Sequence, residues 1–179
     1  MFNTILMKIQ NSNAADLSKI FELYRIATEY MKSKNQVAWP EFSGNMIVKE
    51  IEEQRQWKLI INDTIACVWA TTLSDESIWG AKNNDPSVYI HRIATSPDFR
   101  GQKLVKHIVS WANEYCIKNN LNFVRMDTVG VNKGLIGHYQ KFGFEHTETK
   151  ELEFVGDLPD HYKEGPVCLF QRVVQKQQN

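Results

Sequence analysis

A histidine, a tyrosine and a glycine-containing loop in the middle of the chain supply the groups that an acid–base transfer reaction needs. His91 carries an imidazole, which with an ordinary pKa of ~6.5 can accept a proton near neutral pH. Tyr139 carries a phenol of pKa ~10, which can donate a proton to a developing anion. Arg100 and Gly101 open a loop that leads into a helix, where backbone N–H groups and the helix dipole favour an anion. These groups predict a site that binds a phosphate-bearing ligand and moves protons.

Each of these features also has a purely structural interpretation, and the residues alone leave both open. A single histidine in a strand is often hydrogen-bonded inside the sheet. Tyr139 shares a helical stripe with Leu135 and Ile136, so it can equally be a core residue. Many turns between a strand and a helix bind no ligand.

Two strand–helix units must position these groups. The first is a strand over 88–95, a turn at Ser96-Pro97-Asp98, and a helix with apolar residues at 3.6-residue spacing from Leu104 onward. The second is a buried strand over 123–129, followed by Asn132 and a short helix over 133–142. Alternation in the first strand predicts two opposite faces, with Val88, Ile90 and Arg92 on one and Tyr89, His91 and Ile93 on the other.

The remaining segments complete a mixed α+β order. Asn13 and Asp16 can cap a helix that runs to about Met31. A turn at Asn62-Asp63 predicts a β-hairpin. The other expected elements are an edge strand at 4–10, an amphipathic helix at 45–56, a polar loop at 74–86, and strands at 143–150 and 166–174.

Length and composition indicate one domain over 1–179, with a polar tail at 175–179. The 21 basic and 21 acidic residues balance, which gives no electrostatic case for nucleic acid or an anionic membrane. No apolar run approaches the ~18 residues of a membrane span, and a secretory signal is not expected. Cys67, Cys116 and Cys168 are widely spaced and odd in number, which favours reduced thiols in a cytoplasmic protein over a metal site.

The spacing Asn132-x6-Tyr139-x3-Gly143-Phe144, preceded by the Arg-Gly loop, resembles the GNAT superfamily of N-acetyltransferases over about residues 57–144. The resemblance implies a single-domain acyl-CoA transferase fold, in which a mostly antiparallel mixed sheet is flanked by helices. It also implies that strands 88–95 and 123–129 run parallel and splay apart, with the pantetheine of acetyl-CoA in the gap. No metal is expected.

The resemblance further implies roles for individual residues. His91 matches a histidine base of arylalkylamine N-acetyltransferases, and Tyr139 matches the acid that protonates the departing CoA thiolate. The backbone N–H of Ile93 is expected to polarise the acetyl carbonyl. Lys103 and Val105 depart from the family pattern, which has Gly and Gly or Ala at these positions. The expected cofactor-binding residues are Ile93, Ala94, Thr95, Arg100, Gly101, Gln102, Lys103, Leu104, Val105 and Asn132.

The implied reaction is direct acetyl transfer from acetyl-CoA to a primary amine of a small molecule or peptide, with both substrates bound together. The acceptor is expected on the side of the first two helices, near Trp39, Pro40 and Phe42, with the connection 152–166 close by. A homodimer is compatible with the sequence. The alternative function is a non-catalytic module that binds or senses acyl-CoA, or binds a protein partner, and the departures at Lys103 and Val105 favour it.

Overall fold

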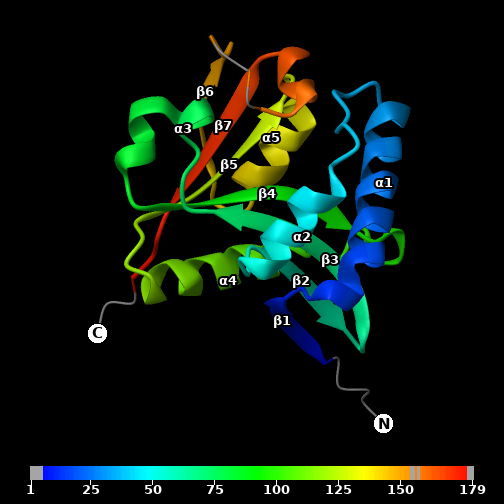
Figure 1. Ribbon diagram of the computed structural model, residues 1–179. Helices are drawn as coiled ribbons and strands as arrows, with labels where there is room; N and C mark the ends of the chain where they lie inside the picture. The colour runs from blue at the N-terminus through cyan, green and yellow to red at the C-terminus, as the bar shows by residue number, and fades with distance from the viewer. Residues whose placement is uncertain (1–5, 154–155, 157, 177–179) are drawn as a thin grey trace.

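A computed structural model describes residues 6–153, 156 and 158–176, which form one layered α+β domain (Figure 1). Its strands form a seven-stranded sheet in the order β1-β2-β3-β4-β5-β7-β6. All neighbouring pairs are antiparallel except β4 and β5, which run parallel. The strands are β1 (Met7–Asn11), β2 (Gln56–Ile61), β3 (Thr64–Thr72), β4 (Ser87–Thr95), β5 (Phe123–Val129), β6 (Glu145–Lys150) and β7 (Val167–Val173).

Helices cover both faces of this sheet. On one face α1 and α2 pack against Val68 and Ala94, and on the other α4 and α5 pack against Cys67 and Trp69. No helix among the described residues combines the length and apolarity needed to cross a membrane. The helices are α1 (Leu17–Ser33), α2 (Gly44–Glu52), α3 (Glu76–Trp79), α4 (Val105–Lys118) and α5 (Lys133–Gln140), with 3₁₀ turns η1 (Ala14–Asp16), η2 (Gly80–Asn84), η3 (Pro97–Phe99) and η4 (Asp160–Lys163).

The capping and turn predictions are confirmed. Asn13 and Asp16 form a reciprocal capping box at η1, from which α1 continues. Asn62 and Asp63 both have positive φ, 46° and 61°, as a two-residue hairpin turn requires. Of the predicted edge strand at 4–10, residues 4 and 5 lie outside the described residues, and β1 begins at Met7.

The parallel pair opens as expected. Pairing between β4 and β5 runs from Ser87 and Phe123 to Ile90 and Met126 and then stops. Both strands continue beyond the last pair, β4 to Thr95 and β5 to Val129. The strands therefore enclose a wedge-shaped gap, and His91 and Asp127 are the first residues of its two sides.

A β-bulge in β4 corrects the predicted strand faces. Val68 pairs with Ala94 but Ala70 pairs with His91, so β4 has one residue more than β3 over this interval. Arg92 takes up the extra residue with a left-handed φ of 55°. The prediction is wrong from Arg92 onward: Arg92 joins His91 on the α1/α2 face, and Ile93 packs on the α4/α5 face.

Two element boundaries also differ from expectation. The helix predicted to reach residue 56 ends at Glu52, because Gln54 has a left-handed φ of 56° and Gln56 begins β2. The segment predicted to be a polar loop contains α3 and η2. Ile78 and Trp79 fold it back onto the sheet, where their exposed fractions are only 1% and 2%.

Candidate active site

The loop that precedes α4 presents a row of free backbone N–H groups. Gly101 and Lys103 have left-handed φ values of 79° and 56°, which turn the chain into the helix. Within the described residues, the N–H groups of Gly101, Lys103, Leu104 and Val105 donate no hydrogen bond. Such a cluster at a helix N-terminus favours an anionic group. Lys103 therefore keeps the backbone conformation that the family pattern assigns to glycine.

The flanking residues fix the position of this loop. The Arg100 guanidinium lies 4.7 Å from the centre of the Tyr30 ring on α1, so the loop and α1 are in contact. The Thr95 hydroxyl donates to Cys67 Sγ at 3.5 Å, and Ala94 is buried against α1 and α2. Residues 91–95 have no strand partner on the β5 side. An extended ligand with amide groups can pair with this open edge.

Tyr139 lies on the α4/α5 face of the gap. Its ring packs against Phe170 and Phe144, with centroid distances of 5.2 and 6.1 Å. Burial, with smaller contributions from the nearby Cys67 and Asp127, raises the Tyr139 pKa to about 12. The phenol is therefore a proton donor at neutral pH.

Asn132 acts as the N-cap of α5, one of the two roles expected for it. Its Oδ1 accepts a hydrogen bond of 3.0 Å from the Leu135 N–H. This bond fixes the first turn of the helix that carries Tyr139.

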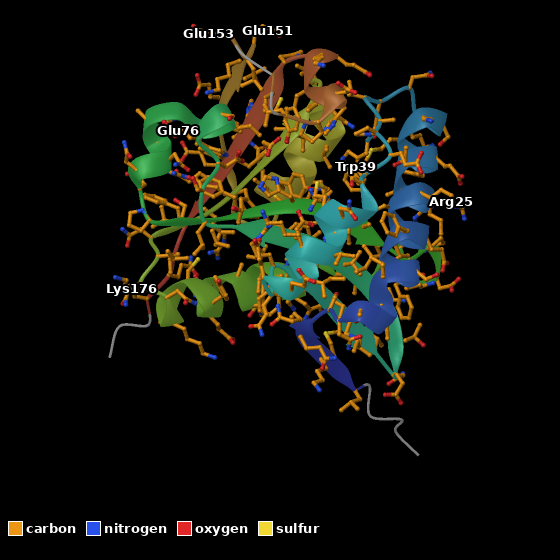
Figure 2. All side chains as sticks on the ribbon, in the orientation of Figure 1. Arg25, Trp39, Glu76, Glu151, Glu153 and Lys176 are labelled. Atoms are coloured by element: carbon orange, nitrogen blue, oxygen red, sulfur yellow. The ribbon has the colours of Figure 1, made fainter. Side chains whose placement is uncertain are left out.

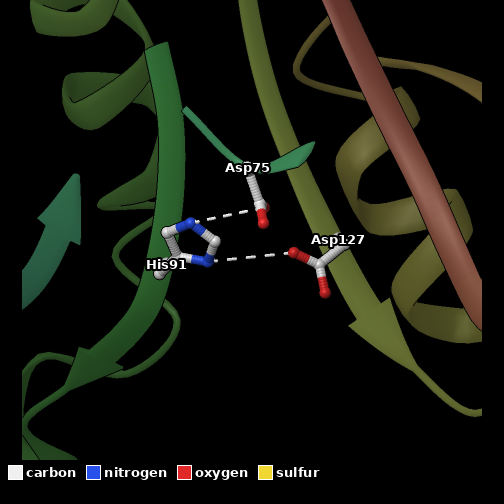
Figure 3. A group of neighbouring side chains, drawn as sticks. All are labelled: Asp75, His91 and Asp127. Atoms are coloured by element: carbon white, nitrogen blue, oxygen red, sulfur yellow. Dashed lines mark ion pairs between the residues drawn. The ribbon is translucent and has the colours of Figure 1, made fainter. Parts of the chain in front are cut away.

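His91 lies on the opposite face of the gap, between two carboxylates from different elements (Figure 3). Its Nε2 is 3.6 Å from Asp75 Oδ2, and its Nδ1 is 3.8 Å from Asp127 Oδ1. Asp75 immediately precedes α3, whereas Asp127 belongs to β5. Tyr162 of η4 donates a 2.7 Å hydrogen bond to the other oxygen of Asp127.

Burial changes the ionisation of all three groups in this cluster. It lowers the His91 pKa to about 3, helped by the positive charges of Arg92 and Arg55. It raises the Asp75 pKa to about 8, with the charge of Asp127 adding to the effect, and the Asp127 pKa to about 6. The ordinary histidine pKa expected from the sequence is therefore wrong: at neutral pH the imidazole is neutral, and the carboxyl groups titrate nearby.

Asp75 and Asp127 are functional candidates that sequence reasoning missed. Asp127 offered a signal, since it is the acidic residue of the predicted buried strand over 123–129. Asp75 offered no such signal, because acidic residues are ordinary in a polar connection.

Arg92 organises the wall next to this cluster. Its Nη2 contacts both Glu50 carboxylate oxygens at 2.6 Å, and its guanidinium lies 5.1 Å from the centre of the Phe42 ring. Phe42, Tyr24 and Trp39 pack together, with ring centroids 5.5 to 6.1 Å apart. The bulge at Arg92 thus ties β4 to the aromatic residues of the predicted acceptor side.

Two hollows of about 570 and 560 Å³ open on that side, one on each side of Trp39 and Pro40 (Figure 2 labels Trp39). Asp160 and His161 line the first hollow, and Tyr24 and Phe42 line the second. Both hollows are lined by Trp39 and Pro40, the loop residues near which an acceptor is expected.

Part of the connection 152–166, which is expected close to the acceptor, lies outside the described residues, at 154, 155 and 157.

Known proteins share both the sequence pattern and the fold. The acetyltransferase (GNAT) family matches residues 22–144. The chain is 31% identical over 71 residues to an uncharacterized N-acetyltransferase of Bacillus subtilis, YesJ, covering 40% of this chain and 39% of that protein. It is 28% identical over 151 residues to an uncharacterized N-acetyltransferase of Methanocaldococcus jannaschii, covering 78% of this chain and 61% of that protein. The matched regions thus span less than two thirds of either relative.

Solved structures match nearly the whole chain. A GNAT-family acetyltransferase from Listeria monocytogenes has a TM-score of 0.75 at 20% identity, with 93% of this chain and 94% of that chain covered. The YncA protein of Salmonella typhimurium, whose structure holds its cofactor acetyl-CoA, has a TM-score of 0.67 at 12% identity, with 97% and 96% covered. At these identities the likeness shows a shared fold.

Proposed function

This chain belongs to the GNAT family of acetyltransferases, and from that premise we propose that it transfers an acetyl group from acetyl-CoA to a primary amine. The observation that carries the proposal is the coincidence of two open backbone features. These are the free N–H groups of the loop before α4 and the unpaired edge of β4 beyond Ile90.

These two features suit two parts of an acyl-CoA, its pyrophosphate and its pantetheine. The N–H groups of Gly101, Lys103, Leu104 and Val105 can bind a pyrophosphate, as can the side chain of Arg100 or Gln102 beside them. The open edge formed by Ile93, Ala94 and Thr95 can pair with the amide groups of pantetheine. Asn132 positions α5, which closes the other side of the gap.

The groups on the two faces of the gap suit different steps of the reaction. On the α1/α2 face, the neutral His91 and its carboxylate neighbours can take a proton from the amine. In the gap, the Ile93 N–H can stabilise charge on the acetyl oxygen. On the α4/α5 face, the Tyr139 phenol can donate to the departing thiolate.

The acceptor is a small molecule or peptide with a primary amine. The hollows beside Trp39 and Pro40 lie on the same face as His91, and each has the volume of a small-molecule site. One hollow has apolar walls at Phe21, Tyr24 and Phe42, which can hold an aliphatic or aromatic group next to the amine.

Replacing Tyr139 with Phe tests the acid role. We expect kcat for CoA release with an amine acceptor to fall by about 10²- to 10⁴-fold. Acetyl-CoA affinity, measured by isothermal titration, should change little, because the phenol acts on the leaving group. The matched control is Tyr115→Phe, since Tyr115 of α4 packs against the rings of Trp57 and Trp111.

The turnover assay and the acetyl-CoA titration together decide between an enzyme and the alternative, a non-catalytic module that binds acyl-CoA or a protein partner. Unchanged kcat in Tyr139→Phe would remove Tyr139 as the acid. Acetyl-CoA binding without turnover on any amine would favour a sensing module. Absence of acetyl-CoA binding would overturn the cofactor assignment.

A further inference from the structure

The cluster around His91 contains more hydrogen-bond acceptors than donors (Figure 3). A neutral imidazole has one N–H, so it can donate to only one of its two neighbouring carboxylates. Its other nitrogen then presents a lone pair to a carboxylate oxygen, which is repulsive without a proton between them. Tyr162 supplies one donor, but to the Asp127 oxygen that faces away from this contact.

Asp75 shows the deficit most directly. Its Oδ2 is buried and has no hydrogen-bond partner in the part of the chain that the structure describes, and the side chain is only 10% exposed. Asp127, whose side chain is 3% exposed, adds a second negative group close by. A buried, unpartnered carboxylate oxygen is costly, so Asp75 either keeps a proton or is paired with a ligand that brings positive charge and N–H donors.

The three side chains can surround a single cation. One ligand atom from each of Asp75, His91 and Asp127 lies within 4.8 Å of the others. Of the cations that fit, an ammonium group also brings three N–H donors for acceptors that lack them.

The cluster is also placed where an acceptor must arrive. His91 and Asp127 are the first residues beyond the last β4–β5 pair, at the narrow end of the gap. The side chain of His91 is 20% exposed, so the cluster is reachable. Asp127 is close enough to Tyr139 to raise its pKa, which places the carboxylate near both faces of the gap.

We propose that Asp75, Asp127 and His91 form a subsite that binds the acceptor as a primary alkylammonium ion. The identity of this ion as the acceptor rests on the proposed function, whereas its binding does not. The subsite selects alkylamines, which are cationic at neutral pH, over aromatic amines and alcohols, which are not.

The protons balance for such an acceptor. The ammonium gives one proton to a carboxylate, directly or through His91, and the neutral amine attacks the thioester carbon. The C–N bond forms and the C–S bond breaks, with the sulfur taking the phenolic proton of Tyr139. The nitrogen then loses a second proton, which returns to the Tyr139 phenolate. The sum is ammonium plus thioester giving amide, thiol and one proton released to solvent.

Ammonium binding should itself release a proton from Asp75. Burial and Asp127 hold the Asp75 pKa at about 8, so this carboxyl is mostly protonated at pH 7. Around it lie His91 of β4, Asp127 of β5 and Tyr162 of η4. A bound cation favours its ionised form, so release approaches one proton at pH 7 and vanishes above about pH 9.

The test titrates the full chain with n-butylammonium chloride in the absence of acetyl-CoA. Binding is followed by NMR of the His91 ring, and proton release by calorimetry in two buffers of different ionisation enthalpy. We expect saturable shifts with n-butylammonium and none with n-butanol. Asp75→Asn and Asp127→Asn should each weaken binding about tenfold or more, and Asp75→Asn should abolish proton release. Asp63→Asn, in the exposed hairpin turn, is the matched control.

The outcomes separate this inference from the proposed function. Equal binding of n-butylammonium and n-butanol to the wild-type protein overturns the subsite without recourse to any variant. Full acetylation of alkylamines by both Asn variants overturns the subsite and leaves the transferase intact. Binding of n-butylammonium by a protein that never binds acetyl-CoA supports the subsite and overturns the transferase.

Discussion

Strands β4 and β5 carry two buried charge clusters only a few residues apart, and the clusters differ in how completely they are satisfied. At the paired end of the strands, Arg125 is 1% exposed. Its guanidinium donates to the Lys82 carbonyl, to Asp85 at 2.6 Å and to Gln171 at 2.7 and 2.9 Å. At the open end, Asp75 Oδ2 has no hydrogen-bond partner among the described residues.

The difference shows that burial of charge does not by itself mark a functional site. The Arg125 guanidinium also lies 4.8 and 4.7 Å from the ring centres of Trp79 and Phe123, so aromatic rings surround it in addition to its hydrogen-bond acceptors. The Arg125 guanidinium therefore offers no free N–H donor to a ligand. Around His91, acceptors outnumber donors and like charges lie together, which is stable only with a proton or a ligand present.

The two clusters are nevertheless coupled. The Lys82 carbonyl and Asp85 belong to the segment that begins at Asp75, so Arg125 anchors that segment to β5. The satisfied cluster thus holds one carboxylate of the unsatisfied cluster in place.

Breaking the satisfied cluster should have the largest effect. Arg125→Met leaves Gln171 and the Lys82 carbonyl without their donor, and we expect a loss of about 3–5 kcal/mol in unfolding free energy. Urea denaturation measures this loss. The control Arg25→Met removes a 62% exposed side chain and should cost under ~1 kcal/mol. A small loss for Arg125→Met would mean that the two clusters do not differ in the way described.

Removing a charge from the unsatisfied cluster should instead change how stability depends on pH. The Asp75 pKa is about 8 in the folded protein against an ordinary 3.8, so the folded state retains a proton that the unfolded state has lost. Wild-type stability should therefore fall as pH rises from about 4 to about 8, by up to about 1.4 kcal/mol per unit of pKa difference. Asp75→Asn should lose most of this slope.

Urea denaturation over this pH range, with Asp63→Asn as control, measures the effect. A slope that is the same in Asp75→Asn and wild type would show that Asp75 ionises in the folded protein without penalty. The two clusters would then be electrostatically alike.

A substitution in the loop before α4 should have the smallest effect. It tests whether the left-handed backbone conformation of Lys103 costs stability. Lys103 has a left-handed φ of 56°, which costs about 1 kcal/mol for a residue with a Cβ. Lys103→Gly should therefore be more stable than Lys103→Ala by about that amount in urea denaturation. Both variants lose the amine, so acetyl-CoA affinities equal to that of the wild type would assign cofactor binding to the backbone. A markedly weaker Ala variant would instead show that the turn itself limits binding.

Local patterns in the sequence were sufficient to predict the loop and the elements around it, whereas the gap between the strands was implied by the family resemblance. The Asn62-Asp63 turn, the Asn132 cap and the glycine at 101 each depend on a few neighbouring residues. Hydrophobic periodicity placed β4, β5 and the helices after them. The family motif then placed Tyr139 beside the gap, where it lies.

The carboxylates beside His91 could not be found in the same way. Asp75 and Asp127 are far apart in the chain, and they meet only because β4 and β5 diverge and Arg125 anchors the segment between them. The bulge at Arg92 was missed for a related reason. It depends on a bidentate contact with Glu50 of α2, which alternation within β4 cannot reveal.

That bulge also bears on how this strand can evolve. Because Arg92 is the extra residue, the side chains of β4 beyond it point to the opposite faces of the sheet from those that strict alternation would give them. A deletion at this point would turn Ile93 toward the α1/α2 face and Ala94 toward the α4/α5 face, although it removes neither residue. Related chains can therefore exchange side chains along β4 one at a time, while a change in its length would move every residue beyond 92 to the wrong side of the sheet.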